Sequence, residues 1–424
     1  MPDGSSTAHL YRPKLVTVLG EGYGVAAFRA DVVAAVTVAI VALPLSMAIG
    51  VASGVGPERA LFAAIIGGAL VSALGGSRFQ IGGPAGAFIT LVAATVARFG
   101  IEGLLLTVFL SGITLTVLGA LRIGSLIRHI PHAVTVGFTS GIAVTIFASQ
   151  LKDIGGLHLT GPEPGALIPK LATLGSAIGT VTPSALLLGL AVVALIFTLR
   201  RYRPNWPRKL IAVVLASLAV ALLHLPVVTI GSRFGGIPHG LSAPHLPPLS
   251  WSLVLAVLPS ALSFTLLGSI ESLLSAKVAD GMTGRHHRSN MELVAQGIAN
   301  IASALFGGIS VTGTIARTAT NIRAGARSPL SGILHSAILL AFMLVAAPLA
   351  SYVPLCALAG VLVVVCWNMA EKGEVVRLLQ SWRTGSVLLA TFGFTIVEDL
   401  TTGIIAGCAV AAAIYLFDRL QQRA

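Results

Sequence analysis

The chain has 424 residues, of which 55% are hydrophobic and only 10% are charged, and its mean hydropathy is +0.92. Soluble domains carry about 25% charged residues, so these values exclude an ordinary water-soluble fold. The net charge of +12 does not indicate nucleic-acid binding, because the sequence has no basic stripe interleaved with aromatic residues. Such an excess is typical of the cytoplasmic loops of membrane proteins. We therefore expect an all-α polytopic membrane protein.

Fourteen apolar segments follow one another along the chain, in two sets of seven. A bilayer core about 30 Å thick requires about 20 apolar residues per helix. The first set is expected at residues 30–51, 60–74, 84–97, 103–121, 131–151, 183–198 and 210–225. The second set is expected at residues 253–276, 293–306, 312–326, 330–347, 353–369, 386–397 and 401–417. The third and tenth segments have only 14 and 15 residues, so we expect half-helices that begin inside the membrane after extended backbone.

The distribution of basic residues predicts the topology. An odd number of spans per set inserts the second set with the opposite orientation. With the N-terminus inside, 21 Lys and Arg residues fall in inner loops, 5 fall in outer loops and one, Arg317, falls within a segment. This bias favours fourteen spans across a bacterial-type inner membrane, with both termini on its cytoplasmic side. The predicted parts are a cytoplasmic segment 1–29, a first repeat 30–230, an extracytoplasmic linker 231–252, an inverted second repeat 253–418 and a cytoplasmic stub 419–424.

Two short motifs interrupt the apolar segments at the same separation in each half. Residues 43–47 (LPLSM) and 79–87 (FQIGGPAGA) form the first pair, and residues 271–274 (ESLL) and 306–314 (FGGISVTGT) form the second. An offset of 227 residues takes Pro44 to Glu271 and Gly86 to Gly313. Repeated broken segments point to the substrate site of a secondary transporter. The alternative is that the glycines only allow helices to cross closely.

The two half-helix starts have the chemistry of an anion site. Pro84 suits a first helical turn, and the hydroxyls of Ser310, Thr312 and Thr314 can cap a helix start. Inverted repeats would aim both starts at one point, each with unpaired N–H groups and roughly half a positive charge. Arg317 lies a little over one turn into the second half-helix, where we expect it to face a cavity and add a full charge. The alternatives are a structural ion pair and a side chain that snorkels to the membrane surface.

Glu271 is the main acidic residue within an apolar segment. A carboxyl group in a membrane can hold a proton at neutral pH, so Glu271 would either couple transport to protons or neutralise Arg317 when the site is empty. Both roles stay open. Its counterpart Pro44 would bend the first helix, and Ser46 could touch the ligand.

Other reactive residues do not form a recognisable catalytic or metal site. The three cysteines, Cys356, Cys366 and Cys408, lie in apolar stretches and are expected to pack as small hydrophobic residues. His286 and His287 lie in a basic loop, where a solvated pair is expected rather than a metal site. The sequence has no Ser/His/Asp or Cys/His constellation and no phosphate-binding loop. We therefore predict no enzyme, no metal and no cofactor.

At these motifs the chain resembles the SulP family of sulfate-permease-like anion transporters. The most specific matches are residues 43–48 (LPLSMA), 82–87 (GGPAGA) and 313–326 (GTIARTATNIRAGA), and the resemblance covers nearly the whole chain. It implies fourteen transmembrane segments in two inverted seven-segment repeats, with two short half-helices preceded by short extended strands. The first to fourth and eighth to eleventh helices would form a core domain, and the others a gate domain.

The resemblance also implies which residues bind the substrate, between the starts of the third and tenth helices. These are Leu45, Ser46, Ala85, Gly86, Ala87, Phe88, Thr312, Gly313, Thr314 and Arg317, and Glu271 completes the site. Its candidate role in proton coupling comes from its place as an acid within an apolar segment. Two departures stand out. Family members often carry Gln where this chain has Leu45, and they normally continue into a cytoplasmic STAS domain, whereas this sequence ends at Ala424. A shortened chain and a natural short form both fit that length.

The function expected from these features is secondary active transport of a small anion by movement of the core domain against the gate domain. The candidate substrates are sulfate, bicarbonate, chloride and C4-dicarboxylates, and Glu271 favours symport with protons. The other expected partners are membrane lipid and a second copy of the chain in a homodimer. The alternatives are a proton-coupled nucleobase transporter of the same architecture, which Arg317 disfavours, and an anion channel. The basic loop 200–209 is interpreted as orienting charge rather than as a lipid-binding site.

Overall fold

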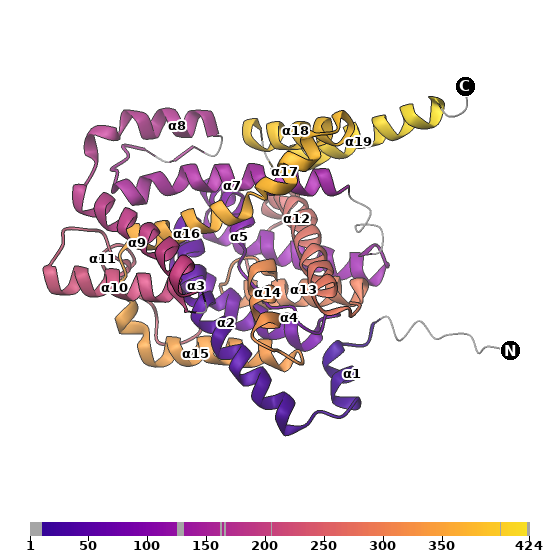
Figure 1. Ribbon diagram of the computed structural model, residues 1–424, viewed down its shortest axis with the longest axis horizontal. Helices are drawn as coiled ribbons and strands as arrows, with labels where there is room; N and C mark the ends of the chain where they lie inside the picture. Colours follow the sequence, from indigo (N-terminus) through magenta and orange to yellow (C-terminus); the bar gives the residue numbers. More distant parts are fainter. Residues whose placement is uncertain are drawn as a thin grey trace. The chain divides into compact units, whose positions relative to one another are not determined.

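The computed structural model describes residues 11–124, 131–161, 163–164, 167–204, 206–398 and 400–421. These residues are mainly helical (Figure 1). Parts of some predictions lie outside the described residues. They are residues 1–10 of the N-terminal segment, residues 422–424 of the C-terminal stub, and the basic residues Arg128 and Arg423 that entered the topology count.

The first half of the chain forms long helices joined by short helical turns. Its elements are α1 (Lys14–Gly20), α2 (Val25–Ala52), α3 (Pro57–Phe62), the π-helix η2 (Ala63–Gly67), α4 (Gly68–Leu74), β1 (Gly82–Gly83), the 3₁₀ turn η3 (Gly86–Phe88), α5 (Ile89–Ala120), α7 (His132–Gly155), α8 (Leu167–Ser176), the 3₁₀ turn η4 (Ile178–Thr180), α9 (Pro183–Tyr202), α10 (Arg208–Leu223) and α11 (Ile230–Phe234). The third and fourth expected segments lie in one element, α5, with a kink at Gly100, whose φ is 70°.

The second half repeats this pattern of long helices around one short strand. Its elements are α12 (Trp251–Thr283), α13 (Ser289–Leu305), β2 (Thr312–Gly313), α14 (Ile315–Arg323), α15 (Leu330–Ala350), α16 (Leu355–Met369), α17 (Lys372–Leu379), α18 (Trp382–Val397) and α19 (Leu400–Gln421). Each of the fourteen expected apolar segments overlaps a helix. α14 has only 9 residues where the sequence predicted 15.

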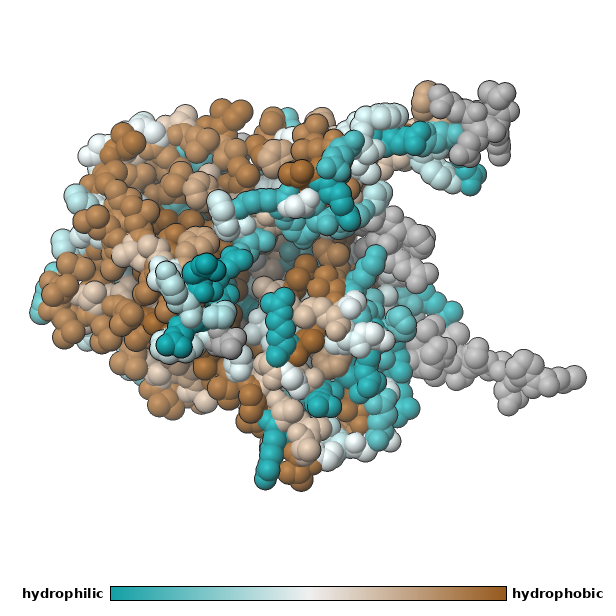
Figure 2. All heavy atoms as spheres, viewed as in Figure 1, coloured by the Kyte–Doolittle hydropathy of each residue, from teal (hydrophilic) through white to brown (hydrophobic). Residues whose placement is uncertain are grey.

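Many helices present apolar side chains to the outside. Among the described residues, nine helices are long and apolar enough to cross a membrane. Leu187 of α9, Leu222 of α10 and Val345 of α15 are 69%, 74% and 82% exposed, and Figure 2 shows apolar side chains gathered over a broad part of one face. An exposed apolar surface of this extent is unusual for a soluble monomer and normal for helices that face lipid.

The described chain divides into two compact units. Unit 1 comprises the described residues within Met1–Arg128, Asn205–Ser217 and Thr229–Val353, and unit 2 comprises those within His129–Pro204, Leu218–Val228 and Pro354–Ala424. Unit 1 therefore contains the first four and the eighth to eleventh apolar segments. Unit 2 contains the fifth, sixth and last three segments, and the seventh is shared between the units. All residues that the sequence assigned to the substrate site belong to unit 1.

Small residues let the helices of unit 1 pack closely. Gly112 of α5 and Gly297 of α13 face each other, and a Cβ on either residue would overlap the backbone of the other helix. Further along the same pair, a Cβ at Gly119 would lie 2.8 Å from the carbonyl oxygen of Asn290. Such close crossings are typical of membrane helices. Close packing therefore explains these glycines of α5 and α13, whereas the glycines of the broken segments have a different role.

Candidate functional site

The two broken segments of unit 1 meet as a pair of short strands. β1 and β2 are antiparallel, with Gly82 opposite Gly313 and Gly83 opposite Thr312. A helix follows each strand: η3 and α5 begin after Ala85, and α14 begins after Thr314. The starts of two half-helices from the two halves of the chain therefore lie at one crossing of extended backbone. We call the strands and these two helix starts the tip crossing.

The structure corrects the expected helix starts. Pro84 lies before the first turn, because Ala85 is the residue that precedes η3. The second helix begins at Ile315, three residues after Thr312, which lies in the strand. Within the described residues neither start has a side-chain cap, so the predicted capping by Thr312 or Thr314 is wrong. The Thr314 hydroxyl donates to the carbonyl oxygen of Ile81 at 3.2 Å instead.

Side chains satisfy the extended backbone of the first segment. The N–H of Ile81 donates to Thr318 Oγ1 at 3.1 Å, and its carbonyl oxygen accepts from the N–H of Thr314 at 3.0 Å. Asn321 Nδ2 donates to the carbonyl oxygen of Phe79 at 2.9 Å. Extended backbone inside a membrane protein must find such partners, since no water or lipid group supplies them. α14 therefore holds the segment that leads into the other half-helix.

A polar stripe on α13 holds the second segment. Asn300 bonds both peptide groups of Val311: Oδ1 accepts from the N–H at 2.9 Å, and Nδ2 donates to the carbonyl oxygen at 2.8 Å. Glu292, Gln296 and Asn300 follow one another at four-residue spacing on one helix face. Gln296 Nε2 donates to Glu292 Oε1 at 3.0 Å, and Glu292 Oε2 accepts from the N–H of Ser77 at 3.0 Å. The sequence interpretation missed this stripe, although three polar residues at that spacing in an apolar segment could have indicated it.

Asn300→Ala is expected to weaken both the fold and the site, because it leaves the buried N–H and carbonyl of Val311 without a partner. Each unsatisfied buried group costs about 1–3 kcal/mol. We expect a lower thermal unfolding temperature and slower anion uptake by the reconstituted protein. Asn290→Ala is the matched control on the same helix, since Asn290 Oδ1 has no partner among the described residues. Equal effects of the two substitutions would contradict the role given to Asn300.

Arg317 is buried at the tip crossing. Its side chain leaves α14 and is 1% exposed. Nη2 donates to Ser46 Oγ on α2 at 3.0 Å and to the carbonyl oxygen of Pro84 at 3.3 Å. Nη1 lies against Gly83, where any Cβ would overlap it. Gly83 is therefore the residue that lets the guanidinium reach the backbone of the other half-helix.

The guanidinium of Arg317 has unused hydrogen-bonding capacity. In the part of the chain that the structure describes, Nε and Nη1 have no hydrogen-bond acceptor and no carboxylate forms an ion pair with this residue. A buried charge without a counterion is costly, and Arg presents its donors in a fork that fits carboxylates and other oxyanions. The arrangement can therefore bind an oxyanion at the unused edge of the guanidinium.

Glu271 contacts the tip crossing from α12. Glu271 Oε2 accepts from the Thr312 hydroxyl at 3.2 Å. Next to it, Ser272 accepts from the N–H of Gly313 at 3.2 Å, and its carbonyl oxygen accepts from Gln80 Nε2 at 3.2 Å. Among the described residues Glu271 and Arg317 form no ion pair, so this structure contains no direct neutralising contact between them. Glu271 is instead connected to the site through its hydrogen bond with Thr312.

The other predicted site residues lie around the same crossing. Leu45 and Ser46 are buried next to each other on α2, with 7% and 0% exposure. Ala85, Ala87 and Phe88 are also buried. Phe88 packs edge-on against Phe264 of α12, with ring centroids 5.3 Å apart. The structure thus brings the residues named from sequence into one part of unit 1. These include Gly86 at the start of η3 and Thr314 before α14.

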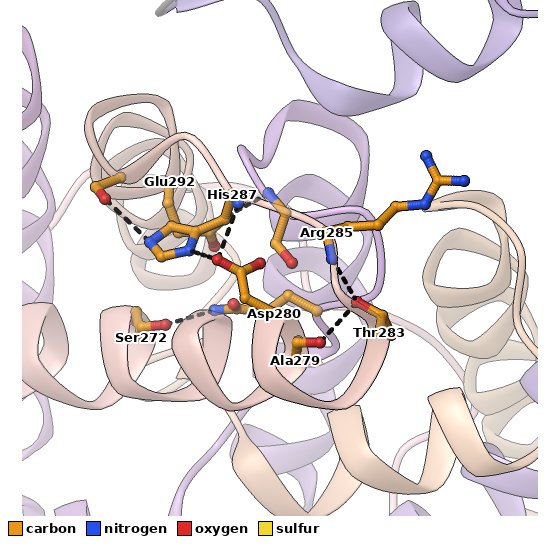
Figure 3. A network of polar contacts seen from close by, with 10 residues as sticks. Ser272, Ala279, Asp280, Thr283, Arg285, His287 and Glu292 are labelled. Atoms are coloured by element: carbon orange, nitrogen blue, oxygen red, sulfur yellow. Dashed lines mark hydrogen bonds and ion pairs between the residues drawn. The ribbon is translucent and has the colours of Figure 1, made fainter.

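The histidine pair differs from its predicted solvated state (Figure 3). His287 Nδ1 lies 2.6 Å from Asp280 Oδ2, which also accepts from the His287 backbone N–H at 3.1 Å. His287 Nε2 lies 3.0 Å from Ser289 Oγ. Only His286 is exposed. The prediction of a solvated pair is therefore wrong for His287, which ties the end of α12 to the start of α13. The described residues contain no group of three or more His, Cys, Asp or Glu that could hold a metal ion.

Comparisons with known proteins agree with this architecture. The model of the sulfate permease family matches residues 28–392. YvdB of Bacillus subtilis (strain 168), a candidate sulfate transporter, is 41% identical over 399 residues, which cover 93% of this chain and 75% of that protein. The bicarbonate transporter BicA of Picosynechococcus sp. is 30% identical over 401 residues, which cover 90% of this chain and 69% of that protein.

Solved structures show the same fold. The transmembrane domain of a cyanobacterial BicA superimposes with a TM-score of 0.80 at 31% identity, over 91% of this chain and 98% of that one. SLC26A9 superimposes with a TM-score of 0.89 at 17% identity, over 97% of this chain and 69% of that one, a likeness of fold. The mostly helical, polytopic membrane fold predicted from the sequence is thereby confirmed. The chain belongs to the sulfate permease family of membrane anion transporters, as its resemblance to SulP predicted.

Proposed function

We propose that this protein is a secondary active transporter that binds a small oxyanion at the tip crossing. The observation that carries the proposal is the buried guanidinium of Arg317, whose Nε and Nη1 lack acceptors among the described residues. An oxyanion placed there would accept two charge-assisted hydrogen bonds. The uncapped starts of η3 and α14 would add the partial positive charges of two helix ends. Sulfate and bicarbonate are the first substrates to test, because relatives carry the names of transporters for these anions.

The proposed transport cycle uses the division into two units. Unit 1 would be the core domain that carries the site, and unit 2 the gate domain against which it moves. The proposal also includes fourteen spans in two inverted repeats across the inner membrane. Both termini would lie on its cytoplasmic side. The 21-to-5 distribution of basic residues supports that topology. A homodimer is the assembly that we expect.

Proton coupling is assigned to Glu271. An ionised carboxylate beside the Thr312 hydroxyl would repel an arriving anion, and protonation would remove that repulsion. Binding of a proton and an anion would therefore favour each other. This mutual preference is what symport requires, since the two ligands must travel together.

Uptake of radiolabelled sulfate and bicarbonate into proteoliposomes tests the function. Concentrative uptake that requires an acidic exterior supports proton-coupled transport. Passive flux that stays linear in substrate concentration would indicate a channel, and concentrative uptake of a neutral nucleobase would favour the nucleobase alternative. Failure to transport any small anion from a folded, reconstituted sample would refute the proposal.

Glu271→Gln is expected to uncouple transport from protons, because glutamine imitates the protonated carboxyl and cannot release a proton. Anion exchange across the liposome membrane should persist, while the stimulation by an inward proton gradient should disappear. The measurement compares initial uptake rates with and without the gradient. Glu102→Gln, at an exposed position of α5, is the control and should keep the stimulation. If the proton gradient still stimulates anion uptake by the Glu271→Gln variant, Glu271 is not the proton-coupling residue.

A further inference from the structure

The ends of α9 and α16 in unit 2 bring basic and aromatic side chains together. Arg200 and Arg201 lie in the last turn of α9. Arg200 Nη1 donates to Asn368 Oδ1 at 2.9 Å, across a sequence separation of 168 residues. Phe197 of α9 packs edge-on against Trp367 of α16, with ring centroids 6.2 Å apart and an interplanar angle of 86°. The two helix ends are therefore fixed to each other by one polar and one aromatic contact.

A third cation joins this group from the next helix. Lys372 at the start of α17 places Nζ over the ring of Trp367, 2.8 Å from its centroid. Arg200, Arg201 and Lys372 are exposed, and Trp367 is 57% exposed. We call these four residues the basic end cluster. One cation, Lys372, therefore lies on an accessible aromatic ring, and Arg200 is bonded to the residue next to that ring in sequence.

Nearby acidic residues offset only part of this charge. Glu371 is exposed next to Lys372. Glu374 is already used, because its Oε2 lies 2.6 Å from Arg377 Nη2 and 3.3 Å from His132 Nε2. The basic end cluster thus keeps an excess of positive charge at its surface.

The cluster lies where α9 leaves the apolar part of its length. Only 22% of the apolar window of α9 is buried in the structure, and Leu187 and Leu190 are 69% and 52% exposed. A helix with such a surface is covered by lipid tails, so its basic end lies at the level of the headgroups. Tryptophan is enriched at this level, and the guanidinium of Arg suits phosphate oxygens.

We propose that the basic end cluster binds the phosphate group of an anionic phospholipid. Arg200 and Arg201 contact the phosphate, Lys372 adds charge, and Trp367 lies against the upper acyl chain. Basic residues that only orient a protein in the membrane need no fixed side-chain position. The bond from Arg200 to Asn368, in contrast, holds the guanidinium in one place before a ligand binds. This assignment goes beyond the sequence interpretation of the basic loop 200–209 as orienting charge, which stays a prediction. It is independent of which anion the protein transports.

Native mass spectrometry of the full chain in mixed micelles tests the proposal, with equal amounts of phosphatidylglycerol and phosphatidylcholine. Wild-type protein should retain phosphatidylglycerol selectively. R200Q/R201Q should lower its apparent affinity about 25-fold, since each basic residue near an anionic surface contributes roughly a fivefold factor. Phosphatidylcholine binding should not change.

Two further samples keep the test decisive. R98Q/R323Q removes the same charge at exposed positions of α5 and α14 and should retain wild-type selectivity. K372Q alters the cluster without touching α9 and should lose roughly fivefold. Inorganic phosphate in excess should displace the lipid from neither wild type nor control, because it lacks the acyl chains that Trp367 contacts. The proposal would be overturned if R200Q/R201Q retained as much phosphatidylglycerol as the wild type. It would also be overturned if R98Q/R323Q lost as much phosphatidylglycerol as R200Q/R201Q.

Discussion

Arg317→Gln is expected to abolish concentrative anion uptake, with initial rates lowered about a hundredfold or more. The substitution removes the only buried guanidinium at the tip crossing among the described residues, together with the donors Nε and Nη1 that have no other acceptor. A hydrogen bond to a charged group is worth about 1.5–3 kcal/mol, so two such bonds account for this factor. The measurement is initial uptake of sulfate and bicarbonate into proteoliposomes, together with their binding by calorimetry.

The stability of the same variant separates a binding role from a structural one. A buried charge without a counterion carries a large desolvation cost, and removing that cost offsets the loss of the bonds to Ser46 and to the carbonyl of Pro84. We therefore expect Arg317→Gln to unfold at the wild-type temperature or above it while transport is lost. Arg323→Gln, at the exposed end of the same helix, should keep both properties. A destabilised Arg317→Gln variant with normal uptake would make Arg317 a structural residue.

The sequence was most informative where local chemistry decides the structure. The breaks at 79–87 and 306–314 could be predicted because clustered glycine and proline disfavour a continuous helix, and the 227-residue offset relates them. The predicted breaks at 43–47 and 271–274 are wrong, because these residues lie inside the continuous helices α2 and α12. The pairing of Gly82 with Gly313 accordingly lies where both halves were expected to meet. The helix starts were less predictable. Thr312 has a good side chain for a cap, but strand pairing and the bond to Glu271 use its backbone and hydroxyl instead.

The partners of residues that act across the fold could not be identified from the sequence. The four-residue spacing of Glu292, Gln296 and Asn300 could indicate a polar face of α13, but only the crossing of two distant segments brings Asn300 to the N–H and the carbonyl of Val311. His287 shows the same limit. Gly284 ends α12 with a positive φ of 69°, which turns the chain back and brings His287 to Asp280. The composition of the loop does not show that the chain turns back toward α12. The sequence therefore predicted a solvated histidine.

Gly313→Ala is expected to eliminate uptake and to lower the unfolding temperature. A Cβ on Gly313 would overlap the side-chain amide of Gln80. Gln80 is 3% exposed and donates to the carbonyl oxygen of Ser272, so it cannot move aside into solvent. Overpacking of this kind costs about 1–3 kcal/mol, and it would separate Gly313 from its strand partner Gly82. Uptake assays and thermal unfolding of the purified protein measure the two effects.

A second-site substitution tests whether overlap with Gln80 is the cause. Gln80→Ala in the Gly313→Ala background removes the obstructing amide, and we expect it to recover part of the uptake that Gly313→Ala loses. Gly281→Ala is the matched control on α12, because a Cβ there meets nothing within 4 Å and alanine favours a helix. It should transport normally and unfold at the same temperature or higher. If Gly313→Ala transports as well as Gly281→Ala, the close contact of the two strands cannot be what shapes the anion site.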